Sequence, residues 1–337
     1  MRLRRIGLPL FVGAALFAAA TTSAMAEVKV VHIAQEFGIS YLPLMVMREQ
    51  HLLEKNAKAA GLGDIQVKWS QFAGGNVMND AILSGDLQFA SGGVGPFVTI
   101  WSKTVNNYRV KGVTAMNSMP LLLTTRNPAI KTIKDFTSKD RIALPAVGVS
   151  IQAITLEMAA EQAFGPGQQN KLNSLTVTMS HPDGMTALLS GKGEVDAHFT
   201  SPPYQYIELA RPGIHTVLNS YDVTGGPHTF NVIWTTSKFA KDNPKTYAAF
   251  VKSFDSAIDF INEHHAQAIK IYVDLTKSKE PASFFEKILN DPNVKFTTTP
   301  QNVMKYAHFM HKVGLIKVEP KSWKDMFFPN LYDKQGS

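Results

Sequence analysis

Two stretches of the chain, AILSGDLQFASGG (residues 81–93) and ALLSGKGEVDAHFTS (residues 187–201), follow one pattern and decide the fold class. Each begins with A-[I/L]-L-S-G at the predicted end of a helix, continues into a predicted strand and finishes in a loop of Gly, Ser or Thr. Gly85 and Gly191 are placed as helix C-caps, a position that glycine favours. The shared motif is short, so its weight comes from the equivalent positions of the two copies, which predict a duplicated α/β architecture.

The segments around each copy alternate between strand and helix patterns. Helix patterns lie at about 41–60, after Gly75, after Pro96, at 150–164 and at 182–191. This order predicts two α/β lobes, each a mainly parallel sheet flanked by helices. Apolar extended stretches at 119–126 and 226–237 connect the lobes, and amphipathic helices follow residue 243. The predicted strands are 28–35, 65–72, 87–90, 141–147, 174–180, 194–199 and 214–220.

The first 26 residues have the pattern of a cleaved secretory signal peptide. Arg2, Arg4 and Arg5 precede an apolar run that ends in Ala24-Met25-Ala26, an A-x-A cleavage site. The run is too short to span a bilayer, so we expect the mature chain in the periplasm. Removing these three arginines lowers the formal net charge from +7 to +4. This mild excess gives no reason to expect nucleic acid as a partner, and the absence of cysteine excludes disulfides and thiolate metal sites.

Candidate ligand-binding residues lie where the predicted strands end. Ligands of parallel α/β sheets bind beyond the carboxyl ends of the strands, in loops that open helices. Backbone N–H groups and positive helix ends in such loops suit an anion. The five predicted loops contain no Lys or Arg; they are residues 35–38, 72–75, 91–93, 148–150 and 199–201. Glu36 would repel an anion, so either it points away from the ligand or the ligand carries an amine or other cationic group. The residues predicted to bind the ligand are Gln35, Phe37, Phe72, Gly92, Gly93, Met116, Val149, Ser150, Phe199 and Thr200.

Five stretches of the chain carry a family resemblance. They are YLPLMVMREQHLLEK (41–55), AILSGDLQFASGGVGPF (81–97), PAVGVSIQ (145–152), MTALLSGKGEVDAHFTSPPY (185–204) and NVIWTTSKFAKDNP (231–244). In these stretches the chain resembles the periplasmic solute-binding proteins of ABC importers, in the branch that handles nitrate, taurine and aliphatic sulfonates. The resemblance covers essentially all of residues 27–330. Relatives often carry Trp-Asp-Pro-Tyr where this chain has Thr200-Ser201-Pro202-Pro203-Tyr204, a departure that leaves the ligand open.

The resemblance implies a type II periplasmic binding protein fold whose lobes close on ligand by a hinge of two crossing strands. The hinge matches residues 119–126 and 228–236, which makes 27–122 plus 233–337 one lobe and 123–232 the other. The implied function is capture of a small organic solute, such as a sulfonate, nitrate or a taurine-like compound, and its delivery to a membrane permease. The expected partners are the permease and ATPase subunits of an importer. We expect a monomer that needs no cofactor.

Two other classes of function stay open from the sequence. A ligand-sensing periplasmic protein would use the same closing cleft. A hydrolase would use Ser150, because residues 148–152 approximate the G-x-S-x-G motif and Asp196 with His198 or His228 follow in the order of α/β-hydrolases. The last glycine of that motif is absent and no oxyanion loop is evident. The histidines show no metal-ligand spacing, so the sequence predicts neither catalytic residues nor a metal site.

Overall fold

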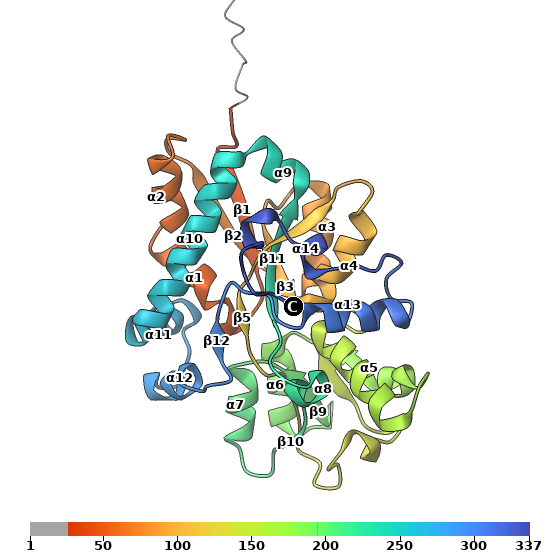
Figure 1. Cartoon of the computed structure of the whole chain (residues 1–337). Helices are drawn as coiled ribbons and strands as arrows, with labels where there is room; N and C mark the ends of the chain where they lie inside the picture. The colour runs from red at the N-terminus through yellow and green to blue at the C-terminus, as the bar shows by residue number, and fades with distance from the viewer. Residues whose placement is uncertain (1–25, 194) are drawn as a thin grey trace, which may run out of the picture.

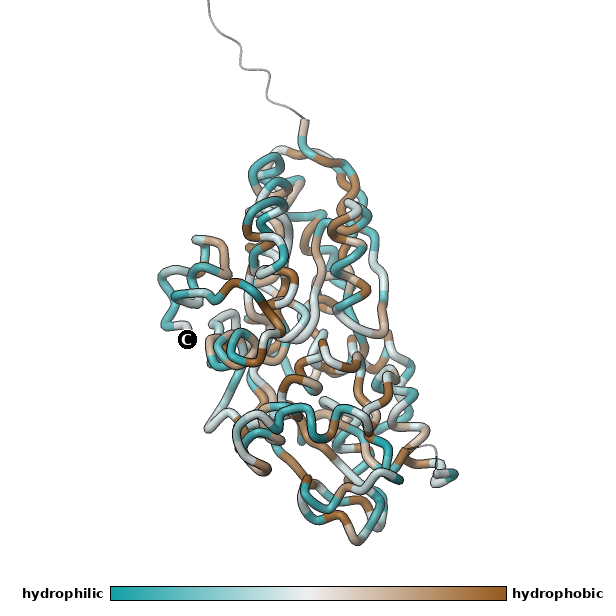
Figure 2. The backbone as a smooth tube through the Cα atoms, turned by 90° about the vertical axis from the view of Figure 1, so that its right-hand side faces the viewer, coloured by the Kyte–Doolittle hydropathy of each residue, from teal (hydrophilic) through white to brown (hydrophobic). Residues whose placement is uncertain are grey.

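The computed structural model describes residues 26–193 and 195–337, which form two α/β lobes arranged along one long axis (Figure 1). The N-terminal strands and the C-terminal helices share the first lobe, at the top of the view. The middle of the chain, coloured yellow-green to green, forms the second lobe below it. Figure 2 shows the same elongated outline from the side. The expected signal peptide falls almost entirely outside the described residues.

Two small sheets form the centre of the first lobe. β1 (Val30–Gln35) pairs in parallel with β2 (Gln66–Gln71). β11 (Asn231–Thr236) lies between β3 (Ala90–Gly93) and β4 (Val110–Ala115) and is antiparallel to both, so a late segment completes a sheet begun early in the chain. The helices on these sheets are α1 (Leu42–Glu49), α2 (Leu52–Ala59), α3 (Gly75–Ser84), α4 (Val94–Thr104), α9 (Ser237–Asp242), α10 (Pro244–Glu263), α11 (His265–Thr276), α12 (Ala282–Leu289), α13 (Val303–Lys312) and α14 (Trp323–Met326).

A five-stranded sheet forms the centre of the second lobe, in the order β10-β6-β9-β7-β8. The central strand β9 pairs in parallel with β7, which also pairs in parallel with β8, whereas β6 is antiparallel to β9 and β10. The sheet is therefore mixed, with two parallel and two antiparallel pairings, whereas the sequence predicts a mainly parallel sheet. The strands are β6 (Leu122–Thr125), β7 (Ile142–Leu144), β8 (Thr176–Thr178), β9 (Ala197–Thr200) and β10 (His215–Asn219), and the helices are α5 (Ile151–Phe164), α6 (His181–Ser190), α7 (Tyr204–Leu209) and α8 (Ser220–Thr224).

Two adjacent stretches of chain connect the lobes. An isolated antiparallel bridge joins Ser118 to Thr229, and the Phe230 N–H donates to the Asn117 carbonyl at 3.2 Å. The short strand β5 (Asn117–Ser118) also pairs with β12 (Lys295–Phe296). The chain therefore leaves the first lobe and returns to it at neighbouring residues.

The apolar stripe of α10 packs on the first lobe, as its period predicts. Phe250 of this helix and Phe89, beside β3, are both fully buried, and their rings stack with centroids 3.7 Å apart. Phe254, Ile258 and Ile261 continue the same buried face. The long C-terminal helix is thus an integral part of the core of the first lobe.

Several helix ends confirm the predictions from the sequence. Gly85 and Gly191 both cap their helices with positive φ, at 88° and 66°. Ser150 caps α5, and its Oγ accepts a hydrogen bond from the Ala153 N–H at 3.2 Å. The two A-[I/L]-L-S-G copies therefore do end equivalent helices, one in each lobe.

Two predicted elements are wrong in detail. The helix expected over residues 41–60 is broken after Glu49, because His51 has a left-handed backbone with φ 52°. The loop expected at residues 91–93 is instead part of β3, where Gly92 pairs with Val232 and Gly93 with Asn231. Glu194, the first residue of one predicted strand, lies outside the described residues, and the observed strand begins at Ala197.

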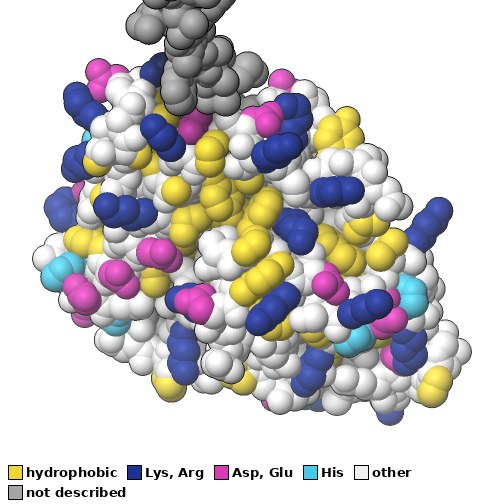
Figure 3. All heavy atoms as spheres, turned by 45° about the horizontal axis from the view of Figure 1, so that its top comes forward, with side chains coloured by type: hydrophobic (Ala, Val, Ile, Leu, Met, Phe, Trp, Pro, Cys, Tyr) yellow, Lys and Arg dark blue, Asp and Glu magenta, His cyan; other side chains and the backbone are white. Residues whose placement is uncertain are grey.

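The surface shown in Figure 3 carries basic and acidic side chains interspersed around a central apolar area. This agrees with the mild net charge of the chain. Across residues 26–193 and 195–337, no helix is long and apolar enough to cross a membrane.

Candidate functional site

A small pocket lies between the two lobes and receives residues from both. Loops at the ends of β1, β2 and β3 line it on the first lobe, and the end of β7 with the first turn of α5 lines it on the second. Phe230, at the returning connection, completes the wall. The strand ends of both lobes therefore meet, as the duplicated pattern predicts. The lining residues are Glu36, Gly74, Gly75, Gly93, Pro96, Pro145, Ala146, Ser150, Ile151, Gln152 and Phe230.

Glycines let the lobes approach each other closely at this pocket. A Cβ on Gly93 would lie 2.8 Å from the Ile151 side chain across the interface. A Cβ on Gly95, in the first turn of α4, would lie 2.5 Å from the Val149 carbonyl oxygen, which is backbone and cannot turn aside. The lobes are therefore in a closed arrangement. This arrangement needs glycine at positions 93 and 95, because a Cβ at either position would collide with the opposite lobe.

The carboxyl group of Glu36 occupies a niche that glycines of two other loops leave open. A Cβ on Gly92 would lie 2.9 Å from Glu36 Oε1, and one on Gly75 would lie 3.4 Å from it. Burial raises the pKa of the Glu36 carboxyl to about 8, although the Tyr41 hydroxyl and the Gly75 N–H stabilise its charged form and oppose the rise. Glu36 is 6% exposed, so this carboxyl lies inside the pocket wall rather than in solvent.

A series of buried amides orients the Tyr41 hydroxyl toward Glu36. Asn117 Nδ2 donates to Asn231 Oδ1 at 3.2 Å, and Asn231 Nδ2 donates to the Tyr41 hydroxyl at 3.0 Å. Because the Tyr41 oxygen accepts from Asn231, its own proton is free to point at Glu36. Both asparagines are fully buried. The first lobe thus presents hydrogen-bond donors to this carboxylate.

The second lobe contributes the N-terminus of α5. Ser150 faces the pocket while its Oγ caps the helix. Gln152, in the first turn of the helix, is 2% exposed, and its Nε2 has no hydrogen-bond partner among the described residues. Leaving a buried amide unpaired costs about 1–3 kcal/mol. A ligand in the pocket would supply an acceptor for it.

A second group of buried polar side chains lies just below the interface. His198 Nδ1 and Glu208 Oε1 are 2.6 Å apart, and Thr124 Oγ1 donates to Glu208 Oε2 at 2.7 Å. Thr200 Oγ1 lies 2.8 Å from His181 Nδ1. Burial, and to a lesser extent His198, lowers the pKa of His181 well below its usual range. The Nδ1 atoms of both histidines are therefore paired within the second lobe, whereas His181 Nε2 and His198 Nε2 have no hydrogen-bond partner among the described residues.

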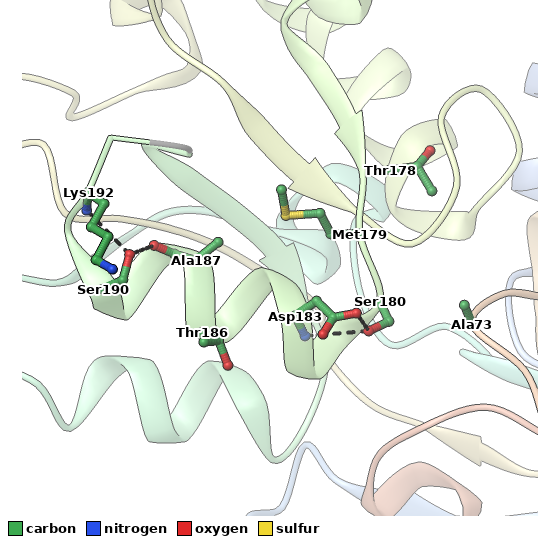
Figure 4. Close-up of a pocket in the computed structure, with 9 residues that line it drawn as sticks. All are labelled: Ala73, Thr178, Met179, Ser180, Asp183, Thr186, Ala187, Ser190 and Lys192. Atoms are coloured by element: carbon green, nitrogen blue, oxygen red, sulfur yellow. Dashed lines mark hydrogen bonds between the residues drawn. The ribbon is translucent and has the colours of Figure 1, made fainter.

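An open groove of about 600 Å³ adjoins the pocket (Figure 4). Ala73 borders it from the first lobe, while β8, α6 and the loop after α6 border it from the second. In Figure 4 the Ser180 hydroxyl meets the Asp183 carboxylate, with Oγ and Oδ2 2.5 Å apart, and Lys192 lies at the far end. Ala73 lines the groove and the next two residues, Gly74 and Gly75, line the pocket, so the two spaces are neighbours.

The structure brings some of the predicted ligand residues together and separates others. Gly93 and Ser150 line the pocket. Gly92 lies next to the Glu36 carboxyl, and the Val149 carbonyl packs against Gly95. Gln35 ends β1, Phe37 is half-buried, and Phe72 packs on the core. Met116 and Phe199 are fully buried in the core, and the fully buried Thr200 pairs with His181. Ligand contact by each of these ten residues stays a prediction.

Several pocket residues are absent from the ligand-binding residues that the sequence predicts. The sequence pattern places Gln152 only within a helix, and it assigns no role to the end of β7 at Pro145-Ala146. The strand-end rule that selects Ser150 could find both, because they flank the same loop. The direction of the Glu36 side chain has no signal in the sequence, since it depends on Gly75 and Gly92 from distant segments.

The side chains expected to form the triad of a hydrolase hydrogen-bond to other groups instead. Ser150 Oγ accepts from Ala153, whereas His198 pairs with Glu208 and His228 Nε2 lies 2.8 Å from Ser220 Oγ. Asp196 Oδ2 accepts from the Arg141 N–H at 2.8 Å. Within the part of the chain that the structure describes, no group of three or more His, Asp or Glu side chains is arranged to hold a metal ion.

Two α/β lobes joined by paired connections, with a pocket between opposing strand ends, define a two-lobed binding-protein fold. The chain belongs to the NMT1-like family, whose model matches residues 24–273. A protein of Bacillus subtilis (strain 168), whose name describes it as aliphatic sulfonates-binding, is 22% identical over 240 residues, which are 70% of this chain and 67% of that protein.

Solved structures share this fold. The alkanesulfonate-binding protein SsuA of Xanthomonas axonopodis pv. citri, bound to MOPS, superposes with a TM-score of 0.69 at 15% identity, covering 87% of this chain and 96% of that one. The periplasmic nitrate-binding protein NrtA of Synechocystis PCC 6803 gives a TM-score of 0.66 at 13% identity, covering 89% and 84%. These similarities confirm the two-lobed periplasmic binding protein fold expected from the sequence.

Proposed function

We propose that this protein is the substrate-binding component of an ABC importer, which captures a small solute between its lobes and delivers it to a membrane permease. The observation that carries the proposal is the pocket lined by the strand ends of both lobes; its volume is about 10 Å³, so the lobes would move apart to admit a solute. Closure of two lobes around a ligand is the motion by which such proteins sequester solutes. Family membership and the names of the sulfonate-binding and nitrate-binding relatives support the same role.

The proposal also specifies a cellular location, the periplasm, and protein partners, the permease and ATPase subunits of the importer. The signal-peptide pattern at residues 1–26 supports export to the periplasm. The closed lobes would form the surface that the permease recognises, and the ATPase subunits would act through that permease. The proposed lobes are residues 27–122 with 233–337, and 123–232; these boundaries fall within two residues of the start of β6 at Leu122 and of β11 at Asn231. The working unit is a monomer that performs no chemistry.

A thermal-shift screen tests this function directly. The protein without residues 1–26 would be screened against sulfonates, nitrate, carboxylates, amino acids and amines. A true ligand at 100 times its Kd should raise the free energy of unfolding by about 2.7 kcal/mol. If no compound of any class changes the melting temperature, the transport role loses its support.

Two pocket variants test the location of the binding site. Ser150→Ala removes a hydroxyl that faces the pocket, and Gly93→Val fills the space next to Ile151. Both should weaken the ligand found in the screen by tenfold or more, measured by calorimetry. Ser180→Ala, which removes the cap of α6 outside the pocket, is the control for losing a helix cap. Wild-type affinity in both pocket variants would place the site elsewhere.

A further inference from the structure

The closed pocket contains one acidic side chain and no compensating cation. Glu36 is the acidic residue in the lining, and the lining contains neither Lys nor Arg; all of these residues lie in the described part of the chain. Tyr41 is the titratable side chain that stabilises Glu36, and the other walls consist of Gly, Pro, Ala, Ser, Ile, Gln and Phe side chains. Lys192 lies in the outer groove, beyond the closed pocket.

Two hydrogen bonds to Glu36 favour its carboxylate form, whereas burial favours the neutral acid. The amide series from Asn117 through Asn231 directs the Tyr41 proton toward it, and the Gly75 N–H belongs to the first turn of the ten-residue helix α3. The N-terminus of a helix favours negative charge. The chain therefore places its own carboxylate at a helix end that a bound anion could otherwise use.

Two hydrogen-bond donors do not compensate a buried negative charge fully. Burial still dominates the environment of Glu36, which is 6% exposed. A cation placed against the carboxylate would favour its charged form, because opposite charges in contact attract, although desolvation of the cation offsets part of the gain. A sulfonate in the same place would meet the carboxylate and no cation.

From this geometry we infer, resting on the proposed solute-binding function, that the ligand is a small organic ammonium compound whose charged nitrogen pairs with Glu36 between the lobes. Gln152 Nε2, which lacks a partner among the described residues, would donate to an oxygen or other acceptor elsewhere on the same ligand. The assignment gives this chain a ligand of opposite charge to the sulfonate and nitrate in the names of its relatives.

Matched pairs of compounds test the assignment by calorimetry and thermal shift. Each pair has one carbon skeleton that ends either in a primary ammonium group or in a sulfonate, from an ethyl group up to a benzyl group. The ammonium member should bind at least tenfold more tightly. Binding of the sulfonate member instead would overturn the inference and leave the solute-binding function intact, whereas failure of every pair and of the wider screen would count against both.

Proton release gives a readout on the wild-type protein alone. A carboxyl with a pKa of about 8 is mostly protonated at pH 7, so pairing it with an ammonium ion should release close to one proton. Calorimetry of the bound ammonium compound in buffers with different ionisation enthalpies measures that number. Affinity should also rise as the pH increases from 6 to 8. A value near zero protons would contradict the pairing.

A pair of substitutions completes the test. Glu36→Gln should abolish the proton release and weaken the ammonium compound at least tenfold. Glu157→Gln is the matched control, because Glu157 is also a buried glutamate with a raised pKa, in α5, but does not line the pocket. It should retain both the affinity and the proton release. Ammonium binding within twofold of wild type in Glu36→Gln would overturn the inference.

Discussion

At the scale of single residues, the Glu36 carboxyl makes stability depend on pH. Its pKa rises from about 4.5 in the unfolded chain to about 8 in the folded protein. A carboxyl with a raised folded pKa contributes stability that is fully present below pH 4.5 and is lost as the pH rises through 8. Each tenfold change in an acid dissociation constant corresponds to about 1.4 kcal/mol, so the loss reaches about 5 kcal/mol at most.

The variant Glu36→Gln should remove this dependence. Without ligand, the free energy of unfolding of the variant relative to wild type should increase steadily between pH 5 and pH 8, as measured by urea denaturation at each pH. Glu286→Gln, at an exposed position of α12, is the control and should give a flat difference. A flat difference for Glu36→Gln as well would show that the carboxyl is not buried in solution.

The close approach at Gly95 leads to a second residue-scale prediction. Gly95→Ala would place a Cβ 2.5 Å from the Val149 carbonyl oxygen, so the variant should fold normally but resist closure. We expect at least tenfold weaker ligand binding and a larger radius of gyration by X-ray scattering in the presence of ligand. Lys103→Ala, at an exposed position of the same helix, should change neither quantity. Normal closure of Gly95→Ala would contradict the contact.

At the scale of elements, α10 depends on one aromatic stack. Phe250→Ala removes a fully buried ring that stacks on Phe89, and such truncations cost about 3–5 kcal/mol. The free energy of unfolding should fall by that amount in urea denaturation. Lys252→Ala, two residues further along on the exposed side, should change it by less than about 0.5 kcal/mol. Equal effects from the two variants would mean that α10 is not held by this face.

The elements also show what the sequence could and could not predict. Helix caps at Gly85, Ser150 and Gly191 follow from local chemistry, so their positions were predictable. The extension of β3 to Gly93 was not, because its partner β11 lies more than a hundred residues later and a local pattern contains no trace of it. The break at His51 has no signal in the sequence, because the residues on both sides keep a helical period.

The same distinction holds for the pocket. Gly93 and Ser150 could be selected because the ends of parallel strands meet at one edge of a sheet, whatever the remaining details. The buried position of the Glu36 carboxyl could not be predicted, because it depends on contacts with Tyr41, Gly75 and Gly92 from three separate segments. Met116 and Phe199 are predicted from their positions along the chain alone; the structure buries both side chains in the core, a direction that depends on register.

At the scale of the whole molecule, closure depends on hydrogen bonds that cross between the lobes. The Tyr306 hydroxyl lies 3.0 Å from Thr155 Oγ1, and α13 packs against both α4 and α5. Thr155 Oγ1 donates to the Ile151 carbonyl, so it accepts from Tyr306. Lys312 and Glu161 add an ion pair at 2.6 Å between α13 and α5, though one partly exposed to solvent.

Tyr306→Phe should shift the molecule toward an open arrangement. Loss of a buried hydrogen bond costs about 0.5–1.5 kcal/mol, which corresponds to a roughly two- to tenfold change in the closure equilibrium. Energy transfer between fluorophores on the two lobes measures that equilibrium. Tyr332→Phe removes a hydroxyl that bonds within the C-terminal segment, so it should leave closure unchanged. An unchanged equilibrium in Tyr306→Phe would mean that this bond does not hold the lobes together.

The bridge between Ser118 and Thr229 has a consequence for how such a chain can be altered. Paired residues of neighbouring strands lie about 5 Å apart. The two connections between the second lobe and the rest of the chain are therefore adjacent at Ser118 and Thr229. Residues 119–228 thus form a cassette: a short turn could replace them without moving either cut end, and the corresponding segment of another family member could be fitted in their place. Such an exchange would replace the pocket residues of the second lobe and would keep Glu36, which belongs to the first lobe.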